Sequence, residues 1–162
     1  MQQPVRILIA DDHLMVREGL KQILELDGDI EVVAQADDGI QCLEQIVQAD
    51  PDVILLDINM PNMNGLEALE KIRQKDKNRK VLILTIHNEI EYLMKAVEIG
   101  INGYVLKDSE SSVLKKAIFS VYEGESYIEP SLTPILKNKI IERKAANEVL
   151  TKREIEVLKL LA

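Results

Sequence analysis

The sequence predicts a doubly wound α/β domain, and two observations lead to that prediction. Five short runs rich in Val, Ile and Leu recur within the first 106 residues, and most are continuously apolar. Such runs are typical of strands buried on both faces of a parallel sheet. Between them, apolar residues recur at helical spacing. Strand and helix therefore alternate five times, which favours a five-stranded parallel sheet covered by helices on both faces.

Each expected element follows from its own apolar residues. The expected strands are residues 5–10, 30–34, 53–56, 81–84 and 104–106. The helices are expected where apolar side chains share one face, namely Val16, Leu20, Ile23 and Leu24; Leu43, Ile46 and Val47; Leu66, Leu69 and Ile72; Leu93, Ala96 and Val97; and Val113, Leu114, Ala117, Ile118 and Val121. These faces are most simply explained by core packing. With the strands numbered in chain order, their expected order across the sheet is 2-1-3-4-5.

The chain changes character after the fifth repeat. Ser131 can cap a further helix whose apolar face is Leu132, Ile135, Leu136 and Ile140. Thr151 and Glu154 have the spacing of a capping box, and Ile155, Leu158 and Leu161 follow on the helix that it would open. The expected organisation is a domain over residues 1–124, a linker with one helix over residues 125–149, and a helical segment over residues 150–162.

Composition narrows the class of protein. The formal net charge is -8, and from Glu123 onward seven acids balance seven bases, so the acidic excess lies in the first part of the chain. A duplex-binding domain usually carries a basic patch, so these residues by themselves are not expected to bind nucleic acid. A single cysteine, Cys42, allows no internal disulfide and fits a small buried residue in a reducing compartment. With no signal-peptide pattern and no bilayer-spanning run, we expect a cytoplasmic protein without a membrane partner.

Acidic side chains follow two of the expected strands. Asp11 and Asp12 come directly after the first strand, and Asp57 follows the third. In this topology ligands bind beyond the carboxyl ends of the strands, between the first and third, so the three carboxylates should meet there. Each could alternatively serve only as a helix cap. Because like charges crowd together at considerable cost, we predict a hard cation at this edge, and Mg²⁺ fits an oxygen-rich site with few protein ligands.

A hydroxyl group and an ammonium group are expected at the same edge. Thr85 ends the fourth strand and Lys107 follows the fifth. Alone, each is an ordinary strand-end residue. Beside three carboxylates and a metal, they predict a phosphoryl-binding site in which an Asp carboxylate acts as the nucleophile, while the metal and Lys107 neutralise charge on the transferring oxygens.

Four segments together resemble the receiver domains of two-component response regulators: ILIADDH, VILLDINMPNMNGLEAL, VLILTIH and AVEIGINGYVLKD. The resemblance covers residues 5–122 without a gap and implies the flavodoxin-like fold. It implies that Asp57 is the phosphoacceptor. It also implies that Asp12, Asp57 and the backbone carbonyl of Asn59 bind Mg²⁺, with Asp11 helping through water.

The same resemblance assigns a switch. Thr85 and Lys107 would contact the phosphoryl group, and Tyr104 matches the aromatic residue that turns inward when Thr85 moves; a sheet-edge aromatic without a switching role is the alternative. Pro61 and Gly65 match the loop after the phosphoacceptor. We interpret His13 and His87, which flank the site, as bystanders.

Residues 150–162, LTKREIEVLKLLA, resemble the opening helix of a LuxR-type helix-turn-helix domain. This points to the NarL/FixJ branch of response regulators; any capped amphipathic helix is the alternative. The turn and the recognition helix that would enter the major groove do not follow, so we expect the DNA-binding domain to be truncated in these residues.

Two positions depart from the usual receiver pattern. Asp108 follows Lys107 where many receivers have proline, and a cis peptide bond forms less easily before a non-proline residue. Ile86 follows Thr85 where many receivers have a small residue. Because a bulky side chain there would shield an acyl phosphate from water, we predict slow self-dephosphorylation.

The expected function is therefore that of a response regulator rather than an enzyme with an external substrate. A sensor histidine kinase would phosphorylate Asp57, favouring homodimerisation and DNA binding by the complete protein. A stand-alone receiver is one alternative, and the helix-turn-helix resemblance argues against it. A phosphohydrolase resembling the haloacid dehalogenases is another, but it would need a second Asp where Asn59 stands, and an amide cannot protonate a leaving group.

Overall fold

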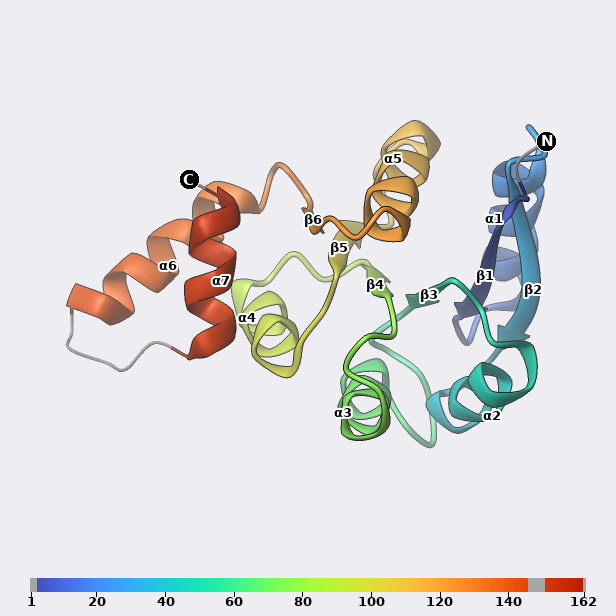
Figure 1. The fold of residues 1–162 in the computed structure, drawn as a ribbon, viewed down its shortest axis with the longest axis horizontal. Helices are drawn as coiled ribbons and strands as arrows, with labels where there is room; N and C mark the ends of the chain where they lie inside the picture. Colours follow the sequence, from blue (N-terminus) through green and yellow to red (C-terminus); the bar gives the residue numbers. More distant parts are fainter. Residues whose placement is uncertain (1–2, 146–150, 162) are drawn as a thin grey trace.

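The computed structural model describes residues 3–145 and 151–161, and it confirms the predicted parallel sheet with helices on both faces. The strands are β1 (Val5–Ala10), β2 (Ile30–Ala36), β3 (Val53–Leu56), β4 (Val81–Thr85), β5 (Gly103–Leu106) and β6 (Tyr127–Ile128). The helices are α1 (Leu14–Glu25), α2 (Gly39–Ala49), α3 (Gly65–Lys75), α4 (Ile90–Ile99), α5 (Ser111–Tyr122), α6 (Thr133–Ala145) and α7 (Lys152–Leu161). All pairings are parallel, in the order β2-β1-β3-β4-β5-β6 (Figure 1).

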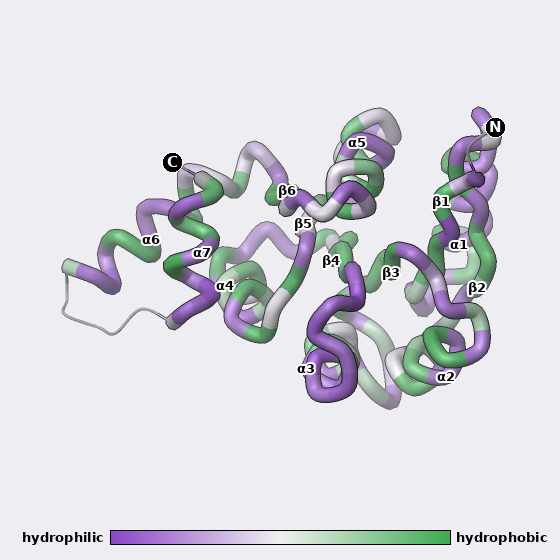
Figure 2. Tube along the Cα trace, viewed as in Figure 1, coloured by the Kyte–Doolittle hydropathy of each residue, from purple (hydrophilic) through white to green (hydrophobic). Residues whose placement is uncertain are grey.

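Alternate side chains of the central strands enter two separate cores. Ile7, Ile9, Val53 and Leu55 pack with α1 and α5 on one face, whereas the intervening residues pack with α2, α3 and α4 on the other. Every residue of β3 is buried, which explains its continuous apolar run. In Figure 2, β3 is hydrophobic, whereas the outer turns of α3 are largely hydrophilic.

The sixth strand is a correction to the prediction of five. Tyr127 and Ile128 pair with Gly103 and Tyr104 and add a two-residue parallel strand to the sheet. This strand lies in residues 125–149, for which the sequence predicts a linker with one helix. A strand of two residues leaves no periodic signal. It is held by Glu129, a buried carboxylate that accepts hydrogen bonds from the Leu106 amide at 3.2 Å and the Ser109 hydroxyl at 2.9 Å.

The helix of the linker starts later than expected. It begins at Thr133, so Ser131 precedes it by two positions rather than one. Leu132, Leu136 and Ile140 are buried as predicted, but Ile135 is exposed. The buried side chains belong to the same core as those of α4, and α6 packs beside α4 and α7 at the end of the molecule away from the N-terminus (Figure 1).

The predicted capping box of α7 is confirmed. The Glu154 amide donates to Thr151 Oγ1 at 3.1 Å, and the Thr151 amide donates to Glu154 Oε1 at 3.2 Å. Glu154 and Val157 are buried against α4 and α6, while Ile155 is exposed. Arg143 of α6 donates to Glu154 at 2.6 Å, and this buried ion pair fixes which side of α7 faces inward. The expected position of Leu150 and the side chain of Leu161 lie outside the described residues.

The helices of the described part of the chain are all too short or too polar to cross a membrane.

Candidate functional site

The carboxyl ends of three strands meet at one ammonium group. Asp11 follows β1, Asp57 follows β3 and Lys107 follows β5. Lys107 Nζ donates to Asp11 Oδ2 at 2.5 Å and to Asp57 Oδ2 at 3.2 Å. Both carboxylates are at least 95% buried, since Asp11 is 2% exposed and Asp57 is 5% exposed. The parallel topology thus brings together groups separated by up to 96 positions in the sequence.

The charges at this edge do not balance. Burial raises the pKa of Asp57 above its ordinary value, and the neighbouring charge of Asp11 raises it further, although Lys107 and the Ile58 amide act against this rise. Burial lowers the pKa of Lys107, but its contacts with Asp11 and Asp57 outweigh that effect and leave the pKa raised. Two buried carboxylates therefore share one ammonium, and the remaining negative charge favours binding of a cation.

Asp12 adds a third carboxylate at the rim. It is exposed, and its Oδ1 lies 2.9 Å from His13 Nδ1. The His13 amide donates to Asp11 Oδ1 at 2.9 Å, and the ligand atoms of Asp11, Asp12 and His13 all lie within 4.8 Å of one another. The carboxylate oxygens match the hard donors that Mg²⁺ prefers.

The loop after β3 holds Asp57 in place. The Ile58 amide donates to Asp57 Oδ1 at 2.8 Å, and the Gly65 amide at the start of α3 donates to the Ile58 carbonyl at 2.8 Å. A Cβ atom on Gly65 would lie 2.0 Å from the Asp57 carbonyl oxygen. Any side chain at position 65 would therefore displace the backbone of Asp57, which explains the glycine in this loop.

Thr85 and Tyr104 are connected through the backbone of His87. The His87 amide donates to Thr85 Oγ1 at 3.2 Å, and the Tyr104 hydroxyl donates to the His87 carbonyl at 2.9 Å. Thr85 and Tyr104 are fully buried. Burial, with the nearby Glu89, raises the pKa of Tyr104, so its hydroxyl stays protonated and able to donate. The Lys107 amide donates to the Thr85 carbonyl at 2.8 Å, which places the two strand ends side by side.

His87 has more contacts than its interpretation as a bystander suggests. Its Nε2 lies 2.6 Å from the amide nitrogen of Asn59, its Nδ1 lies 3.4 Å from Glu89, and its ring stacks on Tyr92 of α4 with centroids 4.3 Å apart. It thus links the loop after β3 to α4. Only its position two residues after Thr85 marks it in the sequence. Asn59 is turned toward His87, and its side chain makes no contact with Asp57 among the described interactions.

The structure therefore brings the predicted residues together in two groups. Asp11, Asp12, Asp57 and Lys107 form an acidic cluster around one ammonium, and Thr85, Tyr104 and Asn59 meet at His87. The Lys107–Asp108 peptide is trans, as the absence of proline at position 108 leads one to expect.

Comparison with known proteins agrees with this arrangement. The family model of the response regulator receiver domain matches residues 7–119. Over 165 residues the chain is 41% identical to the nitrate/nitrite response regulator protein NarL of Escherichia coli K12, covering 99% of this chain and 76% of that protein. It is 39% identical over 168 residues to the oxygen regulatory protein NreC of Staphylococcus epidermidis, covering 98% of this chain and 77% of that protein.

A solved structure is similar along most of the chain. The LuxR-family two-component response regulator from Aurantimonas sp. SI85-9A1 has a TM-score of 0.80 and 32% sequence identity, covering 85% of this chain and 99% of that one. The chain therefore belongs to the response regulator receiver family, and within it to the NarL/LuxR group of two-component response regulators.

Proposed function

We propose that this chain is the phosphorylation-controlled part of a transcription regulator and that Asp57 is the phosphoacceptor. The observation that carries the proposal is the shared ammonium of Lys107, which lies between the buried carboxylates of Asp11 and Asp57. Of the two, Asp57 follows the central strand β3 and is the one fixed by the Gly65 loop. The organisation into residues 1–124, 125–149 and 150–162 belongs to the same proposal.

The chemistry is nucleophilic transfer of a phosphoryl group. A carboxylate oxygen of Asp57 attacks the phosphorus of the donor, the donor's bond to phosphorus breaks, and its electron pair leaves with the donor, here a phosphohistidine of a sensor kinase or a small acyl phosphate. Mg²⁺, held by Asp12, Asp57 and the Asn59 carbonyl with Asp11 contacting it through water, would supply positive charge to the transferring oxygens. Lys107 turns from its carboxylates to the phosphoryl oxygens.

The switch follows from the shared contact with His87. A phosphoryl group on Asp57 offers Thr85 a charged acceptor, and a hydroxyl that turns toward it gives up its contact with the His87 amide. Tyr104 holds the carbonyl of the same residue, so the loop before α4 responds to both side chains. Phosphorylation of Asp57 would thus be a local change of charge that shifts the loop before α4 between two arrangements.

In this proposal, the signal from the phosphorylation site passes through α4 to α6 and α7, which pack beside it. Because α6 and α7 pack on α4, a shift of α4 reaches the segment that opens the helix-turn-helix domain. Phosphorylation would then favour a homodimer and DNA binding by the whole helix-turn-helix domain. A Staphylococcus aureus relative of known structure, 38% identical, is a DNA-binding response regulator of the LuxR family, which supports this assignment.

Intact mass spectrometry after incubation with acetyl phosphate and Mg²⁺ tests the proposal. We expect a single phosphoryl adduct on the unmodified sequence, lost with EDTA and lost in Asp57→Asn. Asp37→Asn is the matched control, because Asp37 is an exposed acid that follows β2 at the same edge of the sheet. An adduct that persists in Asp57→Asn, or that vanishes equally in Asp37→Asn, contradicts the assignment.

A further inference from the structure

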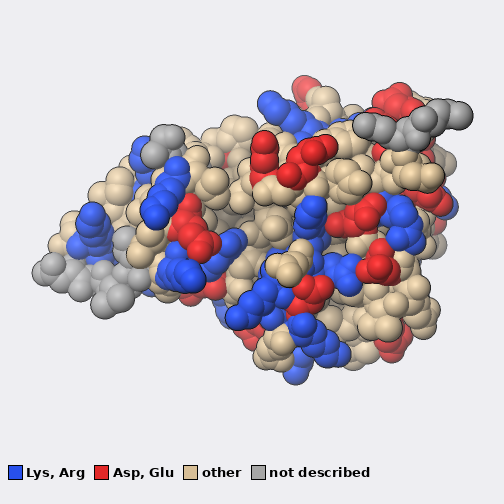
Figure 3. Space-filling view, in the orientation of Figure 1, with Lys and Arg blue, Asp and Glu red and all other residues tan. Residues whose placement is uncertain are grey.

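Positive charge is concentrated at the amino ends of the strands, at the opposite edge of the sheet from Asp57. Residues 71–80, KIRQKDKNRK, contain six basic residues and one acid in a chain whose net charge is -8. They form the last turns of α3 and the loop that leads into β4. The first two residues of α7, Lys152 and Arg153, are also basic. Figure 3 shows Lys and Arg side chains on both α3 and the α7 end of the molecule.

These two basic segments line one cavity of about 380 Å³. Arg73 and Lys77 come from the α3 side, and Lys152 and Arg153 come from α7. Glu156 is the only acid among the described residues that line the cavity. Among the described lining residues, four cations therefore face one acid.

Arg73 is a partly buried cation with neutral partners. Its guanidinium donates to the carbonyls of Gly100 at 2.6 Å and Arg79 at 2.6 Å and to Asn102 Oδ1 at 2.8 Å. No carboxylate pairs with it among the described ion pairs. Burial lowers the pKa of Arg73, and the nearby charge of Arg153 lowers it further, although Asp76 acts against this lowering.

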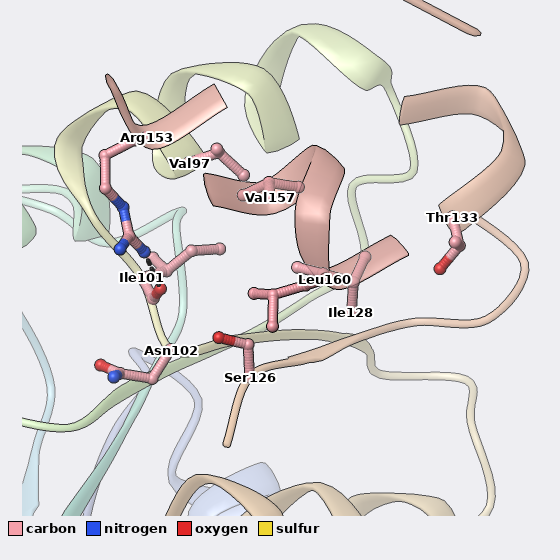
Figure 4. A pocket seen from close by; sticks show the side chains of 9 residues that line it. All are labelled: Val97, Ile101, Asn102, Ser126, Ile128, Thr133, Arg153, Val157 and Leu160. Atoms are coloured by element: carbon pink, nitrogen blue, oxygen red, sulfur yellow. Dashed lines mark hydrogen bonds between the residues drawn. The ribbon is translucent and has the colours of Figure 1, made fainter. Parts of the chain in front are cut away.

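Arg153 approaches Arg73 across Gly100. A Cβ atom on Gly100 would lie 3.4 Å from Arg73 Nε and 3.9 Å from Arg153 Nε, and the φ of +119° at this residue also favours glycine. Arg153 donates to the Ile101 carbonyl at 2.7 Å (Figure 4) and pairs with Glu156 at 2.9 Å, while its buried Nε has no partner among the described atoms. Arg153 also lines a smaller pocket of mixed polarity, together with Val97, Val157 and Leu160 (Figure 4).

We propose that this cavity binds a small phosphate-bearing anion, which holds α7 against the receiver domain. Four cations around one space call for more than one negative charge, and phosphate oxygens suit both the fork of Arg and the point charge of Lys. The N-terminus of the ten-residue α7 adds its dipole in the same sense. Because Arg73 belongs to α3, Lys77 to the loop after it, and Lys152 and Arg153 to α7, a bound anion links α7 to the receiver domain and opposes their separation. This goes beyond the proposed role of Asp57, which lies at the other edge of the sheet.

The test is a calorimetric titration of the full chain with inorganic pyrophosphate in the absence of Mg²⁺. We expect one saturable site, at least tenfold weaker in the double variant Lys77→Gln/Lys152→Gln. The matched control is Lys137→Gln/Lys139→Gln, which makes the same charge change on exposed residues of α6 and should bind as the unmodified chain does. No saturable binding, or equal weakening in both double variants, overturns the proposal.

Two further measurements separate this proposal from others. Amide hydrogen exchange in α7 should slow when pyrophosphate is added, because ligand that binds only the docked state stabilises it; unchanged exchange would contradict the link to α7. A parallel titration with adenosine diphosphate shows whether the anion can be part of a nucleotide, which supports the proposal if the same lysines are needed and opposes it if they are not. The double lysine variant should still accept a phosphoryl group on Asp57, so failure here is distinguishable from failure of the proposed function.

Discussion

The two edges of the sheet carry opposite imbalances of charge. At the carboxyl ends of the strands, two buried carboxylates share the ammonium of Lys107, with Asp12 at the rim. At the amino ends of β4 and β5, Arg73 and Arg153 meet across Gly100, and Glu156 is the one acid among the described residues that line the cavity. Among the described residues, the first edge has an excess of negative charge and the second an excess of positive charge.

The two sites arise by different routes. The acidic edge is assembled by strand topology, because Asp11, Asp57 and Lys107 each directly follow a strand. The basic edge exists only where α7 packs on α4, since half of its cations belong to α7. The acidic edge therefore belongs to the receiver domain itself, whereas the basic edge requires α7 to be packed against that domain.

The largest expected effect comes from removing the ammonium at the acidic edge. Lys107→Ala leaves Asp11 and Asp57 buried without their partner and should lower the free energy of unfolding by about 3 kcal/mol at pH 7. The loss should shrink as pH falls and the carboxylates become protonated. Urea unfolding at pH 7 and pH 4 measures both values. Lys116→Ala, an exposed position on α5, should change stability by less than about 0.5 kcal/mol; a comparable loss there would refute the comparison.

Removing the carboxylate of Asp57 should instead raise the free energy of unfolding. The pKa of Asp57 is raised in the folded protein, so its contribution to stability is present below the unfolded pKa and is lost as pH rises through the folded pKa. Asn does not titrate, and Asp57→Asn should therefore raise the free energy of unfolding at pH 7 by about 1 kcal/mol, with little difference at low pH. Mg²⁺ should stabilise the unmodified chain more than the variant. A variant that is less stable than the parent at pH 7 would show that the edge has no excess of negative charge.

At the basic edge, removing the acid should strengthen anion binding. Glu156→Gln removes the one acidic group among the described lining residues and frees Arg153 from its ion pair at 2.9 Å. For an interaction of roughly 0.6 kcal/mol at a partly exposed site, the dissociation constant for pyrophosphate should fall about threefold. Calorimetry measures this change, and Glu142→Gln on α6 is the control of equal charge. Weaker binding in Glu156→Gln would remove the electrostatic basis of the second site.

The smallest effect is expected beside the acidic edge. Ile86 is 70% exposed next to Thr85, and its side chain is available to shield an acyl phosphate from water. Ile86→Ala should speed loss of the phosphoryl group by about twofold, equivalent to roughly 0.4 kcal/mol in the barrier. The decay of the adduct in intact mass spectra gives the rate. An unchanged or slower decay would rule out shielding by this residue.

Much of the fold was predictable from the sequence because the strands are continuous apolar runs and the helices have clear apolar faces. The meeting of Asp11, Asp57 and Lys107 followed from topology, and the capping box of Thr151 and Glu154 was a local signal. The roles assigned to these residues remain predictions.

Other features depend on contacts that no local pattern encodes. The two-residue β6 is too short for periodicity, and the burial of Glu154 rather than Ile155 depends on Arg143 of another helix. The contacts of His87 depend on the path of the loop before α4, and the basic cavity depends on the docking of α7. In each case the deciding partner lies far away in the sequence.

The most direct test of the central claim is to locate the phosphoryl group itself. After phosphorylation by acetyl phosphate with Mg²⁺, reduction with borohydride converts an aspartyl phosphate to homoserine, and tandem mass spectrometry of the peptides identifies the position. The account predicts homoserine at position 57 alone. Homoserine at position 11 or 12, or a phosphoryl group that resists reduction and maps to His13 or His87, would contradict it.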